Sequence, residues 1–199
     1  MTSPLADLPI TFIGSFPDPA IQLDPPLPEF AFAGRSNVGK SSLLNALTGK
    51  PGLARVSGTP GKTAFLNVFR APDLYLVDLP GYGYARASKT ERHRLSKLVD
   101  AYLSRRDTLA GIVWLLDIRR DPSEDDIALQ AMMAHSGRPA LVVLTKMDKL
   151  THSQVAPRVR ALAAALTLHE DQVQPVSSRT GAGIADLGES LLAAARSFA

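Results

Sequence analysis

The sequence predicts a domain of the α/β class, and three observations support that class. From Glu29 onward, short apolar runs alternate with segments of helical periodicity, as in a mostly parallel sheet with helices on both faces. A glycine-bounded loop joins one apolar run to a helix, which is how such sheets build phosphate sites. With 199 residues, of which 45% are hydrophobic and 21% charged, the chain has the length and composition for one full core.

Six segments are predicted to be strands: 30–34, 64–70, 74–78, 112–117, 140–145 and 172–176. Five segments are predicted to be helices: 40–48, 90–104, 123–135, 153–167 and 184–197. Because the first 28 residues contain seven prolines, we expect residues 1–28 to form an irregular lead-in. Residues 29–199 are predicted to form a single domain, since neither an internal repeat nor a second domain is evident.

The composition excludes several kinds of chemistry. Cysteine is absent, which removes disulfides, thiolate zinc sites and thiol nucleophiles and fits a cytoplasmic protein. No apolar run approaches the ~20 residues that cross a bilayer, so no membrane association is expected. The net charge of +3 permits contact with nucleic acid without requiring it.

One stretch has the spacing of a phosphate-binding loop: Gly34, Arg35, Ser36, Asn37, Val38, Gly39, Lys40 and Ser41. Lys40 is expected at the β- and γ-phosphates, and the Ser41 hydroxyl is expected on Mg²⁺. An ordinary glycine turn is the alternative, but the strand before the loop and the helix after it favour a phosphate site. The loop indicates a nucleoside triphosphate without selecting the base.

Segment 49–63 is rich in glycine, proline, serine and threonine and lacks apolar periodicity, so we expect a mobile loop beside the phosphates. Within it, Thr63 is expected to give Mg²⁺ a second hydroxyl and to order the loop when a γ-phosphate is present. The alternative is a flexible surface connection.

An acidic residue, Asp78, ends the apolar run 74–77 and is followed by Leu79, Pro80 and Gly81. A carboxylate at the end of a buried strand is suited to hold Mg²⁺ through water, and the Gly81 N–H is suited to contact a γ-phosphate. An acid at a strand end is common by itself. Downstream of a phosphate loop it becomes a candidate Walker B element.

The base is expected to be guanine, because Thr145, Lys146, Met147 and Asp148 follow the apolar run 141–144. The Asp148 carboxylate can accept hydrogen bonds from both the N1–H and the 2-amino group of guanine, and adenine offers no such pair. The alkyl stem of Lys146 can lie over the base. Backbone N–H groups at the end of the last strand are expected to meet the guanine carbonyl, at Val176, Ser177 and Ser178. A solvated charged loop is the alternative, which the order of four elements at strand ends outweighs.

With these motifs the sequence resembles the bacterial EngB (YihA/YsxC) family of ribosome-assembly GTP-binding proteins, which are P-loop GTPases of the translation-factor class. The resemblance runs from about Glu29 to the C-terminus. Its most specific features are the runs Thr59-Pro60-Gly61-Lys62-Thr63 and Asp78-Leu79-Pro80-Gly81-Tyr82-Gly83-Tyr84-Ala85, and Asp117-Ile118-Arg119 also matches the family. It implies a P-loop GTPase fold with a six-stranded, mostly parallel sheet, binding of GTP and GDP, and Mg²⁺ ligands at Ser41 and Thr63.

The resemblance also implies a role in maturing the large ribosomal subunit, with precursor rRNA and ribosomal proteins as partners and with effects on cell division and septation. We expect a cytoplasmic monomer. Two other functions are considered: a septum-associated structural protein, and a P-loop phosphotransferase, for which we find no Arg-rich lid insertion. The basic residues in 86–106 are interpreted either as contacts to rRNA phosphates or as a solvated helix face.

We assign catalysis to Lys40, Asn37 and Thr63. Two departures from other GTPases bear on the rate of hydrolysis and on the affinity for guanine. Tyr82 stands where many GTPases carry a water-positioning glutamine, so hydrolysis is expected to be slow without an activator. Thr145 stands where asparagine is usual, which favours weaker guanine affinity. In related GTPases an asparagine at the place of Asn37 helps hold K⁺, and the resemblance implies that role here; a hydrogen bond to the loop backbone is the alternative.

Overall fold

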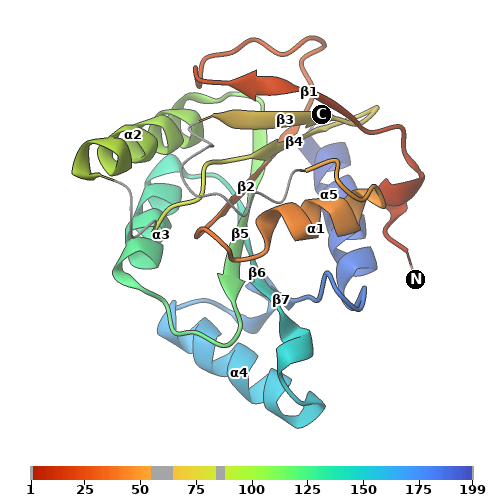
Figure 1. The fold of residues 1–199 in the computed structure, drawn as a ribbon, viewed down its shortest axis with the longest axis vertical. Helices are drawn as coiled ribbons and strands as arrows, with labels where there is room; N and C mark the ends of the chain where they lie inside the picture. Colours follow the sequence, from red (N-terminus) through yellow and green to blue (C-terminus); the bar gives the residue numbers. More distant parts are fainter. Residues whose placement is uncertain (1, 55–64, 84–87, 199) are drawn as a thin grey trace.

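A computed structural model of the protein describes residues 2–54, 65–83 and 88–198 (Figure 1). Its centre is a seven-stranded sheet of order β1-β3-β4-β2-β5-β6-β7. The strands are β1 (Thr11–Phe16), β2 (Glu29–Gly34), β3 (Leu66–Arg70), β4 (Tyr75–Asp78), β5 (Leu109–Asp117), β6 (Ala140–Thr145) and β7 (Val173–Pro175). Strands β4, β2, β5, β6 and β7 run parallel, whereas β3 is antiparallel to both β4 and β1.

Within the described ranges, five α-helices cover both faces of the sheet (Figure 1). They are α1 (Lys40–Thr48), α2 (Lys89–Arg105), α3 (Glu124–Ser136), α4 (His152–Ala165) and α5 (Ile184–Phe198). One core cluster joins the sheet to α2, α3 and α4, and the other joins it to α1 and α5. Strand β5 shows the alternation, because Trp114 faces the first cluster and Val113 and Leu115 face the second. Burial on both faces explains why the parallel strands have continuous apolar sequences.

The prediction of six strands is corrected to seven, because the lead-in supplies strand β1. β1 pairs with β3 along the edge of the sheet, with Thr11 opposite Arg70 and Phe16 opposite Leu66. Residues 10–16 form a proline-free run between Pro9 and Pro17, and an edge strand needs hydrogen bonds on one side only. The irregular conformation predicted for residues 1–28 is therefore wrong over this strand.

The start of the chain is also ordered. A short 3₁₀ helix (Pro4–Asp7) begins with Ser3, whose side chain accepts a hydrogen bond from the Leu5 N–H at 3.2 Å. Leu5 and Ile10 are buried in the cluster that contains α1 and α5. These residues share the core of the sheet, so residue 29 does not mark the edge of that core.

A buried polar cluster at the start of β2 fixes the C-terminal end of α2. The Glu29 carboxylate accepts from Tyr102 Oη at 2.6 Å, from Arg106 Nε at 2.8 and 3.0 Å, and from the Thr108 hydroxyl. Glu29 and Arg106 are 1% and 8% exposed, so this ion pair lies inside the protein. Arg106 also donates to the Ile21 carbonyl, which ties the lead-in to the same point.

None of the described helices has the length and apolarity that a membrane span needs.

Candidate functional site

The predicted phosphate loop lies between the C-terminal end of β2 and the N-terminus of α1. Gly39 caps α1 with a φ of 111°, and Asn37 has a φ of 65°. Both are left-handed conformations, which glycine adopts freely and asparagine tolerates. The loop thereby turns back on itself and presents the free N–H groups of the first turn of α1, where the helix dipole attracts anions.

Lys40 and Asp78 meet at the base of this loop. Lys40 Nζ forms an ion pair with Asp78 and donates to the Leu79 carbonyl at 2.6 Å. Asp78 is 6% exposed, and its other oxygen lies 3.5 Å from the Asn67 amide. The sequence prediction that these two motifs share one site is therefore supported by direct contact.

Of the two predicted Mg²⁺ ligands, Ser41 lies among the described residues. Ser41 lies in the first turn of α1, and among the described residues no group of three or more His, Cys, Asp or Glu gathers at one point. A Mg²⁺ ion bound by the Ser41 hydroxyl would thus complete its shell with phosphate oxygens and water. Gly61, Lys62 and Thr63 lie outside the described residues, so the second metal ligand stays a prediction.

The segment after Asp78 lies against the phosphate loop. Ser36 N donates to the Tyr82 carbonyl at 2.9 Å, and Leu79 N donates to Phe32 O at 3.0 Å. A Cβ added to Gly81 would lie 3.0 Å from Ser36 Oγ, so only glycine fits there without movement. Pro80 is buried beside it.

Lys146 and Thr145 bind the loop from the end of β6. Lys146 Nζ donates to Asn37 O at 2.8 Å and to Asp117 Oδ2 at 3.0 Å. Thr145 Oγ1 is buried and lies 2.7 Å from Val38 O and 3.1 Å from Leu116 O. The Thr145 hydroxyl has one proton to donate, and backbone carbonyls accept it. Threonine can thereby bond the phosphate loop, as one of the two amide protons of an asparagine could.

Asp117 is a site residue to which the sequence analysis assigned no role. Burial alone would raise the pKa of Asp117, but hydrogen bonds from Arg119 and Lys146 outweigh it and hold the pKa below its usual range. Asp117 therefore stays ionised and fixes Lys146 over the site. The available signal was a carboxylate at the C-terminal end of a buried strand.

At the predicted base site, the two carboxylate oxygens of Asp148 differ in their partners. Ser177 Oγ donates to Asp148 Oδ1 at 2.8 Å. Within the described part of the chain, Asp148 Oδ2 is buried and has no hydrogen-bond partner. Lys149 and Arg179 place cations 3.9 and 3.8 Å from it. Met147 N donates to Val176 O at 3.1 Å, so the loops that end β6 and β7 form one unit, with Ser178 half-buried beside it.

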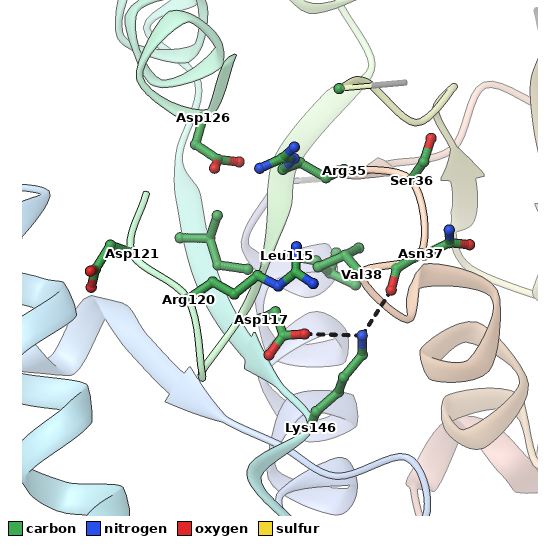
Figure 2. A pocket seen from close by; sticks show the side chains of 12 residues that line it. Arg35, Ser36, Asn37, Val38, Leu115, Asp117, Arg120, Asp121, Asp126 and Lys146 are labelled. Atoms are coloured by element: carbon green, nitrogen blue, oxygen red, sulfur yellow. Dashed lines mark hydrogen bonds and ion pairs between the residues drawn. The ribbon is translucent and has the colours of Figure 1, made fainter. Parts of the chain in front are cut away.

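A cavity of about 380 Å³ lies beside the phosphate loop, between the end of β5 and α3 (Figure 2). Tyr82 lies near it, with its side chain turned toward β5 and α3. Its hydroxyl donates to Asp126 Oδ1 at 2.8 Å and accepts from Trp114 Nε1 at 3.0 Å. Burial and the neighbouring Asp126 carboxylate raise the pKa of Tyr82 far above its ordinary value, so it cannot serve as a base.

Comparison with known proteins gives the family. A model of a family described as 50S ribosome-binding GTPase matches residues 29–146. A probable GTP-binding protein EngB of Gemmatimonas aurantiaca is 47% identical over 83% of this chain and 82% of its own length. The chain belongs to the EngB family. A second EngB protein, from Shouchella clausii, is 47% identical over 79% of this chain and 81% of its own length.

Solved structures share the fold of this EngB-family chain. A crystal structure of a probable EngB protein superposes with a TM-score of 0.71 at 23% identity, covering 85% of this chain and 99% of the other. Era in complex with MgGDPNP and a 16S rRNA fragment superposes with a TM-score of 0.66 at 25% identity, covering 84% of this chain and 56% of Era. The P-loop GTPase fold and the EngB family predicted from the sequence are thereby confirmed.

Proposed function

We propose that this EngB-family protein binds GTP and GDP with Mg²⁺, hydrolyses GTP slowly, and uses the nucleotide state to control its binding to precursors of the large ribosomal subunit. The observation that carries the nucleotide choice is Asp148 Oδ2, a buried carboxylate oxygen without a hydrogen-bond partner among the described residues. Such an atom is costly unless a ligand satisfies it. The N1–H and 2-amino groups of guanine supply the donors.

The phosphate end of the site supports triphosphate binding. Lys40 moves its ammonium from Asp78 and Leu79 O toward the β- and γ-phosphates, and Gly81 N–H contacts the γ-phosphate. Ser41 and Thr63 would hold Mg²⁺, which would neutralise charge on the transferred phosphoryl group. Asn37 offers its carboxamide oxygen to K⁺ at the same edge. Its side chain makes no hydrogen bond within the described residues, which favours the ion over the backbone contact.

Slow hydrolysis follows from the position of Tyr82. Its hydroxyl is engaged by Asp126 and Trp114, and no side chain of the 78–83 segment offers a carboxamide to orient water. The charge that develops in the transition state is then stabilised by Lys40, by the backbone N–H groups at the phosphates and by the bound cations, without a water-positioning side chain from this segment. An activating partner or ion is expected to supply the rest.

The ribosomal role is supported by the family description and by helix α2. α2 follows the 78–83 segment and exposes basic side chains, among them Lys89, Arg94, Lys97 and Arg105. Cations at that position suit rRNA phosphates. Disturbed cell division and septation would be a consequence of failed subunit assembly. We place this work in the cytoplasm, by a monomer.

Co-sedimentation with purified ribosomal subunits tests this function. We expect the protein to pellet with large subunits in GTPγS and Mg²⁺, and to stay in the supernatant in GDP or with small subunits. Replacing Lys89, Arg94 and Lys97 by glutamate should reduce pelleting by tenfold or more at low salt, because each lost phosphate contact lowers affinity. Arg160→Glu on the exposed face of α4 is the matched control. Equal pelleting in both nucleotides would contradict a nucleotide-controlled switch.

A further inference from the structure

Tyr82, Trp114 and Asp126 form a closed hydrogen-bonded set, which we call the latch. The Tyr82 hydroxyl donates to Asp126 Oδ1 at 2.8 Å and accepts from Trp114 Nε1 at 3.0 Å. Asp126 and Trp114 are 2% and 1% exposed. The second Asp126 oxygen accepts from Ser123 N at 2.7 Å and from Ser123 Oγ at 2.6 Å. Each buried polar atom of the latch therefore has a partner, and the ring of Tyr82 is held in one orientation.

The latch joins the phosphate loop to α3 through a single residue. The backbone of Tyr82 is bonded to Ser36 by its carbonyl, and its side chain is bonded to α3 by its hydroxyl. Gly81, whose N–H we assign to the γ-phosphate, is the preceding residue and lies against Ser36. Because Tyr82 is bonded at its carbonyl to Ser36 and at its hydroxyl to Asp126 and Trp114, we expect a shift of the adjoining Gly81 peptide to strain these bonds.

We propose that the two hydrogen bonds of the Tyr82 hydroxyl hold the Gly81 peptide in the position described. These bonds break, and the latch is withdrawn, when the Gly81 N–H binds the γ-phosphate of GTP. This inference rests on the proposed binding of GTP. Tyr82 acts as a positioning residue: it touches no phosphate, and it sets how readily the Gly81 peptide moves toward one. Because GTP favours the withdrawn form and GDP the latched form, the latch lowers the affinity for GTP relative to GDP.

Withdrawal does not leave the Asp126 carboxylate without a partner. Figure 2 shows the Arg35 guanidinium and the Asp126 carboxylate pointing toward one another at the cavity. The Arg35 side chain makes no hydrogen bond or ion pair within the described residues. We therefore expect Asp126 to be bonded to Tyr82 in one state and to Arg35 in the other, which would be the two discrete arrangements that a switch requires.

The latch also carries the signal to a helix. Asp126 is the third residue of α3 and closes its capping box with Ser123. A change of hydrogen-bond partner at Asp126 would therefore alter the capping of the N-terminus of α3. Helix α3 packs beside α2. Both helices that border the 78–83 segment can respond to the nucleotide.

Trp114 allows a direct test, because it is the one tryptophan of the chain and its indole N–H is part of the latch. Its emission is recorded for the full-length protein loaded with GDP or with GTPγS. We expect the two spectra of the wild type to differ. In Tyr82→Phe, which keeps the ring and removes the hydroxyl, both spectra should match that of the wild-type GTPγS form. The affinity for GTPγS relative to GDP should rise about three- to tenfold.

Tyr75→Phe is the matched control, because it removes another buried tyrosine hydroxyl, bonded to Pro25 O at 3.1 Å and far from the phosphates. It should leave the affinity ratio and the GDP–GTPγS difference in emission unchanged. Equal wild-type spectra in the two nucleotides, or an unchanged affinity ratio in Tyr82→Phe with an equal loss of thermal stability in both forms, would show a purely structural hydroxyl and overturn the latch. Failure of GTPγS to bind the wild type at all would overturn the proposed function itself, and titration detects that outcome separately.

Discussion

At the scale of single residues, the site depends on groups whose partners come from other strands. Asp148 is held by Ser177, Lys146 by Asp117, and Thr145 by the backbone of the phosphate loop. The sequence predicted Asp148 and Lys146 because their motif has a fixed spacing. It did not predict the role of Asp117, because that role depends on a contact between residues 29 positions apart.

Asp148→Asn is expected to lose GTP and to gain xanthosine triphosphate. The substitution exchanges two acceptors for one acceptor and one donor, which suits the 2-carbonyl of xanthine. The Ser177 hydroxyl can still donate to the amide oxygen. Competition titrations with both nucleotides measure the change, with Asp186→Asn on the exposed face of α5 as control. Unchanged preference for GTP would place the base elsewhere.

Hydrolysis by the wild type is expected to be about tenfold faster in K⁺ than in Na⁺ at equal ionic strength, if Asn37 binds the ion near the developing charge. Asn37→Gly should abolish the difference. Glycine keeps the left-handed φ of 65° without strain, so it separates loss of the carboxamide from distortion of the loop. Phosphate release is the measurement, and equal wild-type rates in both salts would argue against the ion.

At the scale of elements, the helices and parallel strands were predictable because each has a strong local signal. Strands buried on both faces read as continuous apolar runs, and α3 (Glu124–Ser136) lies within a residue of the predicted helix 123–135. The sequence did not predict β1, because this segment lies among prolines. The strand also depends on hydrogen bonds to β3, and a pairing between distant segments leaves no local pattern in the sequence. The predicted sheet therefore has one strand too few at this edge.

Glu29→Ala is expected to lower the free energy of unfolding by about 3–5 kcal/mol, because it leaves the buried Arg106 guanidinium without its anion. Tyr102 and Thr108 lose their acceptor at the same time. Urea unfolding measures the loss. Asp121→Ala, which breaks an exposed pair with Arg158, is the control and should change stability little. Similar effects of both variants would show that the buried cluster adds no special stability.

At the scale of the whole molecule, the start of the chain completes the core. Leu5 is fully buried between α1 and α5. Leu5→Ala is expected to cost about 2–5 kcal/mol of stability, with nucleotide affinity unchanged at temperatures where the protein remains folded. Ile13→Ala, at an exposed position of β1, should have a much smaller effect. A small effect of Leu5→Ala, measured by thermal unfolding, would mean that the lead-in is dispensable.

The buried Glu29–Arg106 cluster gives α2 a fixed pivot. Tyr102 and Arg106 bind the C-terminal end of the helix where β2 begins, and Lys89 lies at its opposite, N-terminal end. A 17-residue helix is about 25 Å long. Turning such a lever by ~10° about its base carries Lys89 through about 4 Å, more than the length of a hydrogen bond. On the proposed function, a rotation of that size would displace the exposed basic side chains of α2 relative to a row of rRNA phosphates by more than a phosphate contact tolerates.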